Sequence, residues 1–196
     1  MLNYVEYGKE NKYDDDIFFQ KYSQMSRSQQ GLAGAGEWET LRKLLPDFKD
    51  KRVLDLGCGY GWHCIYAMEH GASSVVGVDI SHKMLEVAKE KTHFPQVEYK
   101  CCAIEDVEFP EESFDVILSS LAFHYVADYE ILVKKIYRIL KSGGKLVFTV
   151  EHPVFTAYGT QDWYYNEKGE ILHFPVDNYY YEGKRTAVFL GEKVTK

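Results

Sequence analysis

The spacing of apolar and polar positions along this chain alternates between the patterns expected of strands and of helices. Five apolar runs read as strands: KRVLDLG, SVVGVDI, QVEYKC, SFDVILSS and KLVFTVE. The first run has almost no alternation, which is typical of a central parallel strand buried on both faces. The repeated change between strand and helix predicts an α/β fold with a doubly wound sheet of five parallel strands and helices on both faces.

Helical patterns occupy the segments between these runs. We expect Ser81 and Asp128 to cap two of the helices, and Gly71 to end the helix over residues 62–70. The core-facing positions expected on the helices are Trp38, Leu41, Leu44, Leu45, Met84, Leu85, Ala88, Leu132, Val133, Ile136, Ile139 and Leu140. Ligands of such sheets bind beyond the carboxyl ends of the strands, so the loops after the strands are the expected functional segments.

The pattern divides the chain into three parts. Residues 1–36 are polar and aromatic and contain GLAGAG, which suggests a flexible arm that either covers the ligand site or lies on the surface. Residues 37–153 carry the strand and helix rhythm and form the expected ligand-binding domain. Residues 154–196 lose that rhythm and are rich in aromatic side chains, which indicates a substrate lid or an aromatic mini-core under a long loop.

Composition narrows the function classes. The 196 residues are 45% hydrophobic and 27% charged, which suits one globular domain, and the formal net charge is −7. With no basic stripe, we expect no nucleic-acid partner. With no apolar run near 18 residues and no apolar leader, we expect no membrane association and a cytoplasmic location. The four cysteines lack zinc-ligand spacing, so we expect reduced thiols and no metal site.

The glycine loop after the first strand limits which nucleotide can bind. The spacing Gly57-x-Gly59-x-Gly61, followed by Trp62, departs from the G-x-G-x-x-G fingerprint of dinucleotide sites. A carboxylate at Asp55 would repel a pyrophosphate and attract an ammonium group. Asp79, 18 residues after Gly61, is placed to accept hydrogen bonds from two ribose hydroxyls. A ligand with a ribose, a positive group and no phosphate is S-adenosylmethionine.

At these residues the sequence resembles the class I S-adenosylmethionine-dependent methyltransferases of the small-molecule type, which have a Rossmann-like fold. The resemblance covers VLDLGCGYG, VVGVDIS, AIEDVEFPEESFDVILSSLAFHYV and LKSGGKLVFTVEHP. It implies S-adenosylmethionine as cofactor and S-adenosylhomocysteine as product. The cofactor-binding residues that we expect are Asp55, Gly57, Cys58, Gly59, Gly61, Asp79, Ile80, Met84, Ala103, Ile104, Glu105, Ser119 and Leu121.

One position departs from the family pattern. Many relatives carry an aspartate just after the third strand that accepts a hydrogen bond from the adenine amino group, and Ala103 stands there. We expect a backbone carbonyl or water to replace it, at a cost of ~0.5–1.5 kcal/mol per lost hydrogen bond.

Methyl transfer from a sulfonium needs alignment and exclusion of water, and a general base where the acceptor carries a proton. The candidate catalytic residues are His124, Glu151 and His152, which follow the fourth and fifth strands; His124 and His152 are equally open to a structural role. The candidate substrate-binding residues are Tyr125, Phe155, Trp163 and Tyr164.

The family fold usually continues with a helix and an antiparallel hairpin at the sheet edge, and residues 154–196 lack a long amphipathic helix. We therefore expect these elements to be missing through truncation, or replaced by a hairpin from NYYYEGKRTAVFL. An uncovered fifth strand would favour self-association. A methyltransferase acting on a small molecule is the favoured function; the alternatives are a non-catalytic cofactor-binding protein and, less favoured, an NAD-dependent oxidoreductase.

Overall fold

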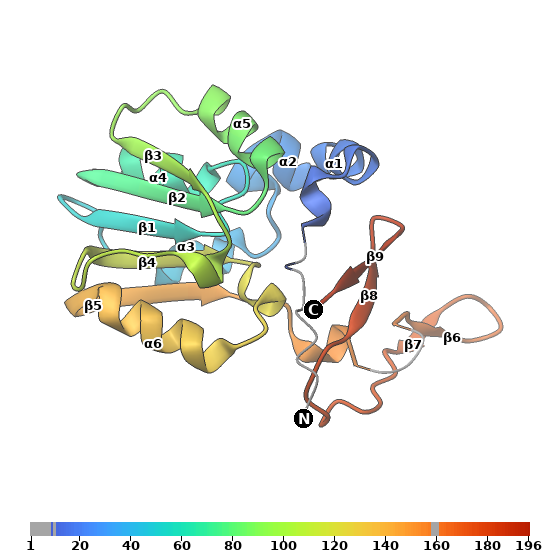
Figure 1. Ribbon diagram of the computed structural model, residues 1–196. Coiled ribbons are helices and arrows are strands. Elements are labelled where there is room, and N and C mark those ends of the chain that lie inside the picture. Colours follow the sequence, from blue (N-terminus) through green and yellow to red (C-terminus); the bar gives the residue numbers. More distant parts are fainter. Residues whose placement is uncertain (1–8, 10, 158–160) are drawn as a thin grey trace.

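A computed structural model describes residue 9, residues 11–157 and residues 161–196. Its centre is a five-stranded sheet in the order β3-β2-β1-β4-β5, in which every neighbouring pair is parallel (Figure 1). The strands are β1 Arg52–Leu56, β2 Ser74–Asp79, β3 Val97–Cys101, β4 Phe114–Ser120 and β5 Leu140–Thr149. The predicted number and direction of the strands are confirmed.

Helices cover both faces of this sheet, as predicted. The α-helices are α1 Asp16–Ser23, α2 Ser26–Gln30, α3 Trp38–Leu44, α4 Trp62–Glu69, α5 His82–Lys91 and α6 Tyr129–Ile139. Side chains of β1 alternate between two cores: Leu54 and Leu56 pack with residues of α6, and Val53 packs with residues of α4 and α5. A strand buried on both faces needs apolar residues at successive positions, which explains why the first run shows no alternation.

The ends of the helices follow the expected capping chemistry. The Ser81 hydroxyl accepts a hydrogen bond from the Met84 N–H at 3.1 Å, and the Asp128 carboxylate accepts one from the Ile131 N–H at 2.9 Å. Two expected core positions are wrong, because Leu44 is 64% exposed and Val133 is 41% exposed. Among the described residues, no element covers either side chain.

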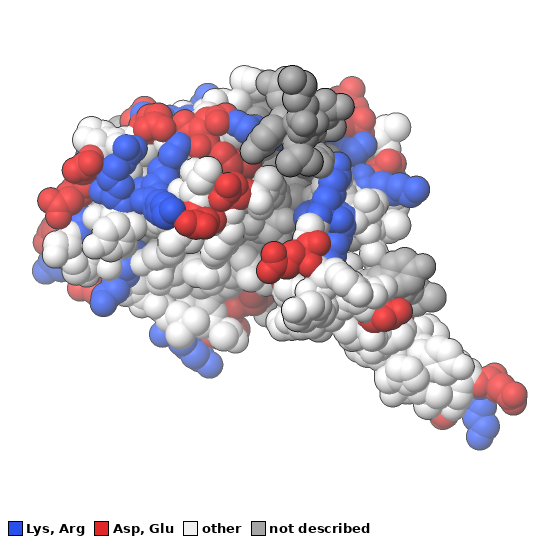
Figure 2. Space-filling model, turned by 60° about the horizontal axis from the view of Figure 1, so that its bottom comes forward, with Lys and Arg blue, Asp and Glu red and all other residues white. Residues whose placement is uncertain are grey.

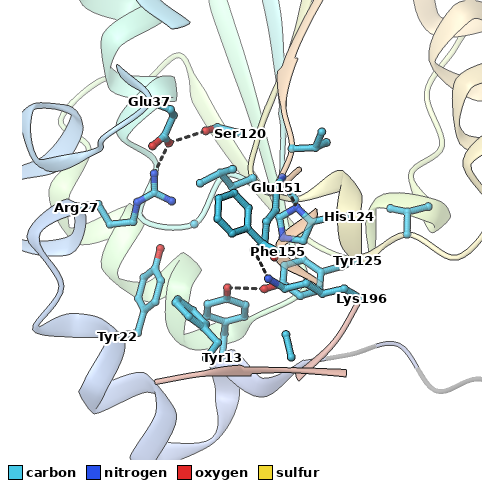
Figure 3. Close-up of a pocket in the computed structure, with 18 of the residues that line it drawn as sticks. Tyr13, Tyr22, Arg27, Glu37, Ser120, His124, Tyr125, Glu151, Phe155 and Lys196 are labelled. Atoms are coloured by element: carbon cyan, nitrogen blue, oxygen red, sulfur yellow. Dashed lines mark hydrogen bonds and ion pairs between the residues drawn. The ribbon is translucent and has the colours of Figure 1, made fainter. Parts of the chain in front are cut away.

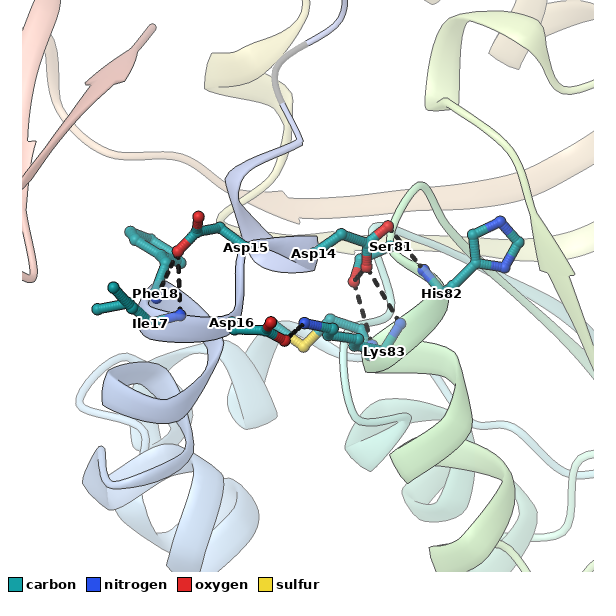
Figure 4. Close-up of polar contacts among 9 residues, drawn as sticks. Asp14, Asp15, Asp16, Ile17, Phe18, Ser81, His82 and Lys83 are labelled. Atoms are coloured by element: carbon teal, nitrogen blue, oxygen red, sulfur yellow. Dashed lines mark hydrogen bonds and ion pairs between the residues drawn. The ribbon is translucent and has the colours of Figure 1, made fainter.

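Much of the N-terminal arm, where the structure describes it, forms short helices that the sequence did not indicate. It contains α1, α2 and the 3-10 turns η1 Lys12–Asp14 and η2 Gly31–Gly34. The Asp14 carboxylate accepts hydrogen bonds from the Ser81 hydroxyl at 2.6 Å and the Lys83 N–H at 3.1 Å, at the start of α5 (Figure 4). A carboxylate suits the positive end of a helix dipole, so this contact ties the arm to the sheet domain.

The segment after β5 forms two small hairpins. They are β6 Tyr164–Tyr165 with β7 Ile171–His173, and β8 Thr186–Phe189 with β9 Glu192–Thr195. Phe18 of α1 packs against Ala187 and Val194, so the β8–β9 hairpin lies beside the arm and not at the sheet edge. The hairpin expected from NYYYEGKRTAVFL therefore forms in part, but it does not replace the edge hairpin. Among the described residues, no strand pairs with the outer edge of β5.

Charged side chains are spread over the sheet domain, while the β6–β7 side of the molecule projects from it with few charges except at its tip (Figures 1 and 2). Within the described part of the chain, no helix is both long enough and apolar enough to span a membrane.

Candidate active site

A cavity of ≈ 860 Å³ lies beyond the carboxyl ends of the strands, where a doubly wound sheet places its ligands. Its walls come from the glycine loop after β1, the ends of β2, β4 and β5, the arm, and β8 with residues near it. The predicted site residues that line it are Gly57, Gly59, Asp79, Ile80, Met84, Ala103, Ile104, Glu105, Leu121, His124, Tyr125, Glu151, His152 and Phe155.

Asp79 lies where the glycine loop meets the start of α5. Its carboxylate accepts hydrogen bonds from the Gly59 N–H at 2.8 Å and the Ser81 N–H at 2.9 Å. Burial raises the pKa of this carboxyl, and the two backbone donors act in the opposite direction. A carboxylate oriented by backbone donors is suited to accept further hydrogen bonds from ligand hydroxyls.

The three glycines of the loop have different surroundings. A Cβ atom on Gly59 would meet nothing within 4 Å, so the backbone leaves room for a ligand at this point of the cavity. A Cβ atom on Gly61 would lie 2.2 Å from the Tyr99 hydroxyl. Gly61 does not line the cavity, so the structure does not place it in contact with the cofactor. It packs instead on Tyr99 beneath the loop.

Three other expected cofactor residues also lie outside the cavity. Asp55 is 1% exposed, and its Oδ2 accepts a hydrogen bond from the Cys64 thiol at 3.5 Å, so direct contact with a ligand ammonium is not available. Cys58 is buried among the residues between β1 and α4. Ser119 donates its hydroxyl to the Leu56 carbonyl at 2.8 Å. Asp55 pairs with Leu118, the neighbour of Ser119 in β4, so Asp55 and Ser119 lie on opposite faces of the sheet, and neither lines the cavity.

Ser120 faces the cavity in place of Ser119, and it joins a polar group with Glu37 and Arg27. Arg27 from α2 forms an ion pair with Glu37, and the Ser120 hydroxyl donates to the same Glu37 oxygen at 3.2 Å (Figure 3). Burial raises the pKa of Glu37, but hydrogen bonds and the Arg27 charge outweigh it and lower the pKa overall. Alternation along the strand could have indicated that Ser120 faces the cavity. Nothing in the sequence indicates that Ser120 pairs with Glu37.

At the other end of the cavity, four polar side chains gather from distant parts of the chain. The Glu151 carboxylate forms an ion pair with the Lys196 ammonium, which lies over the Tyr125 ring at 5.9 Å from its centroid (Figure 3). The Glu151 N–H donates to His124 Nδ1 at 3.4 Å. Burial and the Lys196 charge lower the pKa of His124 to about 4, while Glu151 acts in the opposite direction. Lys196 was not expected, because no local pattern marks it.

The remaining predicted residues divide between the rim and the projecting hairpin. His152 is exposed at the rim, where its Nδ1 accepts a hydrogen bond from the Val154 N–H at 3.3 Å. Phe155 lines the cavity. Trp163 and Tyr164, which were expected to bind substrate, are 45% and 57% exposed and do not line it. They pack instead on Phe174 and His173 of the same segment.

Comparison with known proteins decides the family. A family profile described as a methyltransferase domain matches residues 54–148. A solved structure from Listeria monocytogenes, assigned as an S-adenosylmethionine-dependent methyltransferase, is 57% identical with a TM-score of 0.77, covering 82% of this chain and 76% of that one. An S-adenosylmethionine-dependent methyltransferase from Mesorhizobium loti is 41% identical with a TM-score of 0.73, covering 79% and 70%.

The chain belongs to the class I S-adenosylmethionine-dependent methyltransferases. This confirms the family and the cofactor that the sequence indicated, and it sets aside the oxidoreductase alternative. The methyltransferase is also similar to a ubiquinone biosynthesis O-methyltransferase from Coxiella burnetii, at 36% identity over 56% of this chain. It spans about half the length of that relative, 47%.

The residues present fit S-adenosylmethionine. The cavity offers an oriented carboxylate at Asp79 for a ribose, and the open backbone at Gly59 leaves room beside it. Apolar side chains of Ile80, Met84 and Ile104 line the same region. Ala103 is 6% exposed at the cavity wall, and it supplies no side-chain acceptor for an adenine amino group.

Proposed function

We propose that this methyltransferase moves a methyl group from S-adenosylmethionine to a small-molecule acceptor by in-line displacement. The observation that carries the proposal is a single cavity that extends from Asp79 to Glu151 between the arm and β8. Its volume of ≈ 860 Å³ is within the range of ~300–1,000 Å³ usual for small-ligand pockets. The similarity to a ubiquinone biosynthesis O-methyltransferase supports an acceptor of this class.

The chain's own residues would bind, align and desolvate the reactants. When bound, the cofactor supplies a methyl group on a sulfonium, whose S–CH₃ bond breaks as the bond to the acceptor forms, with the electron pair staying on sulfur. Asp79 would hold the ribose, and Glu151 is the candidate base for a proton that the acceptor loses. The arm, tied to α5 by Asp14, is the proposed lid that excludes water from the reaction.

The acceptor class can be tested without knowing the acceptor. The full chain is incubated with S-adenosylmethionine labelled in its methyl group and a bacterial extract divided into low-molecular-mass, protein and nucleic-acid fractions. We expect label in the low-molecular-mass fraction, and much less with the variant Asp79→Ala. Label in a macromolecular fraction would contradict the small-molecule acceptor. No transfer to any fraction, together with S-adenosylhomocysteine binding in calorimetry, would favour the non-catalytic alternative.

Self-association through the outer edge of β5 is also proposed. Among the described residues, no strand covers this edge. Unpaired strand edges are templates for pairing with another chain. Sedimentation of the full chain over a range of concentrations tests this, and a monomer at every concentration would contradict it.

A further inference from the structure

His124 is the ring at the end of the cavity whose role the sequence left open. It lies in the 3-10 turn η4 Phe123–Tyr125 after β4, and it lines the cavity beside Glu151 and Lys196 (Figure 3). A histidine at this place serves as a general base only if an unprotonated ring nitrogen faces the acceptor. The hydrogen bonds of the ring decide which nitrogen that is.

The backbone of residue 151 determines the tautomer of His124. The N–H of Glu151 points at Nδ1 with a separation of 3.4 Å, and a backbone N–H can only donate. Nδ1 must therefore carry the lone pair. In a neutral imidazole one nitrogen accepts and the other donates, so the proton of His124 lies on Nε2.

The surroundings of His124 keep the ring neutral. The Lys196 ammonium, whose side chain is 8% exposed, acts on the ring with its positive charge. Glu151 opposes that positive charge, but its carboxylate is already paired with Lys196. Burial and the lysine together hold the pKa of His124 near 4. At neutral pH the ring is therefore uncharged and has no imidazolium proton to give up.

Nε2 is the ring atom left for a ligand. Among the described residues, no hydrogen bond to Nε2 is found. Nε2 is also absent from the fully buried polar atoms without a partner, so it is open to a ligand. Because the residue lines the cavity and its Nδ1 edge is turned to β5, the N–H at Nε2 is the polar group that His124 can offer to an acceptor.

We infer that His124 is a substrate-positioning hydrogen-bond donor, and that the methyl acceptor carries an unprotonated oxygen, as in a carbonyl, a carboxylate or an ionised hydroxyl, which binds Nε2–H. This rests on the proposed function. A neutral N–H cannot remove a proton from the acceptor, so the assignment of His124 as base is replaced. Any proton lost in the reaction goes to Glu151 or to solvent.

The first test reads the tautomer directly and needs no acceptor. The full chain, labelled with ¹⁵N-histidine and saturated with S-adenosylhomocysteine, is examined by long-range ¹H–¹⁵N correlation from about pH 5.5 to about pH 8. We expect His124 to show a neutral ring with the proton on Nε2 throughout. A proton on Nδ1, or a titration within this range, would overturn the inference.

The same spectrum contains an internal control. Nδ1 of His70 lies 2.8 Å from the Tyr66 carbonyl oxygen, which can only accept. His70 in its neutral form should therefore show the reverse pattern, with its proton on Nδ1. The signals of His124 are assigned by their loss in either variant described next.

The second test compares His124→Gln with His124→Asn, using the low-molecular-mass extract as the acceptor pool. The glutamine amide N–H reaches about as far as Nε2, and the asparagine amide only about as far as Nδ1. We expect the glutamine variant to exceed the asparagine variant by about tenfold in turnover, since the donor is retained in one and lost in the other. Equal, strong losses in both would indicate that a titrating imidazole is needed, which contradicts the inference.

The outcomes separate this inference from the proposed function. If the wild-type chain transfers no label to the extract, the proposed function fails, and the tautomer of His124 is still decided by the spectrum. If label is transferred but His124 carries its proton on Nδ1, the enzyme acts on small molecules and the inference alone is wrong.

Discussion

Gly61→Ala should destabilise the fold because of what lies beneath the glycine loop. Gly61 has φ +75°, and an added Cβ would lie 2.2 Å from the Tyr99 hydroxyl and 3.0 Å from its ring carbon Cζ. The tyrosine is held in place, because its hydroxyl bonds to Thr92 at 2.7 Å. A Cβ on Gly77 would approach the same ring to 2.7 Å, which leaves Tyr99 little room to move.

The expected cost is the sum of two effects. A left-handed conformation costs an L-residue roughly 1–2 kcal/mol, and overpacking in a closed site costs about 1–3 kcal/mol. Gly61→Ala should therefore lower the free energy of unfolding by roughly 2–5 kcal/mol. Gly143 is the matched control, with φ +76° and nothing within 4 Å of an added Cβ. Gly143→Ala should cost only the first effect, about 1–2 kcal/mol.

Urea unfolding of the cofactor-free variants measures both costs. Gly59→Ala completes the comparison, because its φ is +52° and its added Cβ would extend into open cavity. We expect Gly59→Ala to resemble Gly143→Ala in stability but to bind S-adenosylhomocysteine more weakly in calorimetry. If Gly61→Ala were no less stable than Gly143→Ala, the packing of the loop on Tyr99 would not be as described, and the reasoning would be refuted.

Four further substitutions, one of them a control, test the site and the docking of the arm. Asp79→Ala should weaken S-adenosylhomocysteine binding by roughly 1–3 kcal/mol, because two ribose hydroxyls lose their acceptor; an unchanged dissociation constant in calorimetry would contradict this. Asp14→Ala should lower unfolding free energy by about 1–2 kcal/mol, since it removes the carboxylate that accepts from Ser81 and Lys83. Asp16→Ala, which removes only an exposed ion pair to Lys83, should cost less than about 0.5 kcal/mol, and equal costs in urea unfolding would show that Asp14 does not dock the arm. Burial raises the pKa of Asp55 to about 7; the Cys64 thiol lowers it and Asp79 raises it. Because the pKa in the folded state is the higher one, the wild type should lose stability as pH rises from about 4 to about 7, and Asp55→Asn should lack this loss, on the order of a few kcal/mol. Parallel pH profiles of unfolding for the two proteins would disprove it.

Much of the sheet domain could be predicted from local pattern. Strands β1 and β2 are buried on both faces, and such strands require unbroken apolar runs that are visible in the sequence. The starts of α5 and α6 follow from Ser81 and Asp128, since a cap acts within one helical turn. The position of Asp79 at the end of β2 follows from the same local reasoning.

The direction of side chains at strand ends was harder to predict. A shift of one residue changes the face, so Ser119 was expected in the cavity although Ser120 occupies that place. Asp55 was expected near a ligand ammonium, but its strand position turns it toward Cys64. Ser119 and Ser120 are the same residue type, so composition does not show which of the two faces the cavity.

The sequence by itself determined the order of strands and helices, the glycine loop and the carboxylate at Asp79, because these depend on residues close together in the chain. Only the tertiary structure brought Arg27 to Glu37 and Ser120, and Lys196 to Glu151. The path of the chain after β5 joins residues 45 apart at one end of the cavity, and no periodicity encodes such a contact. The tautomer of His124 likewise depends on a backbone N–H contributed by a different strand end, so it became visible only when the two strand ends were placed side by side.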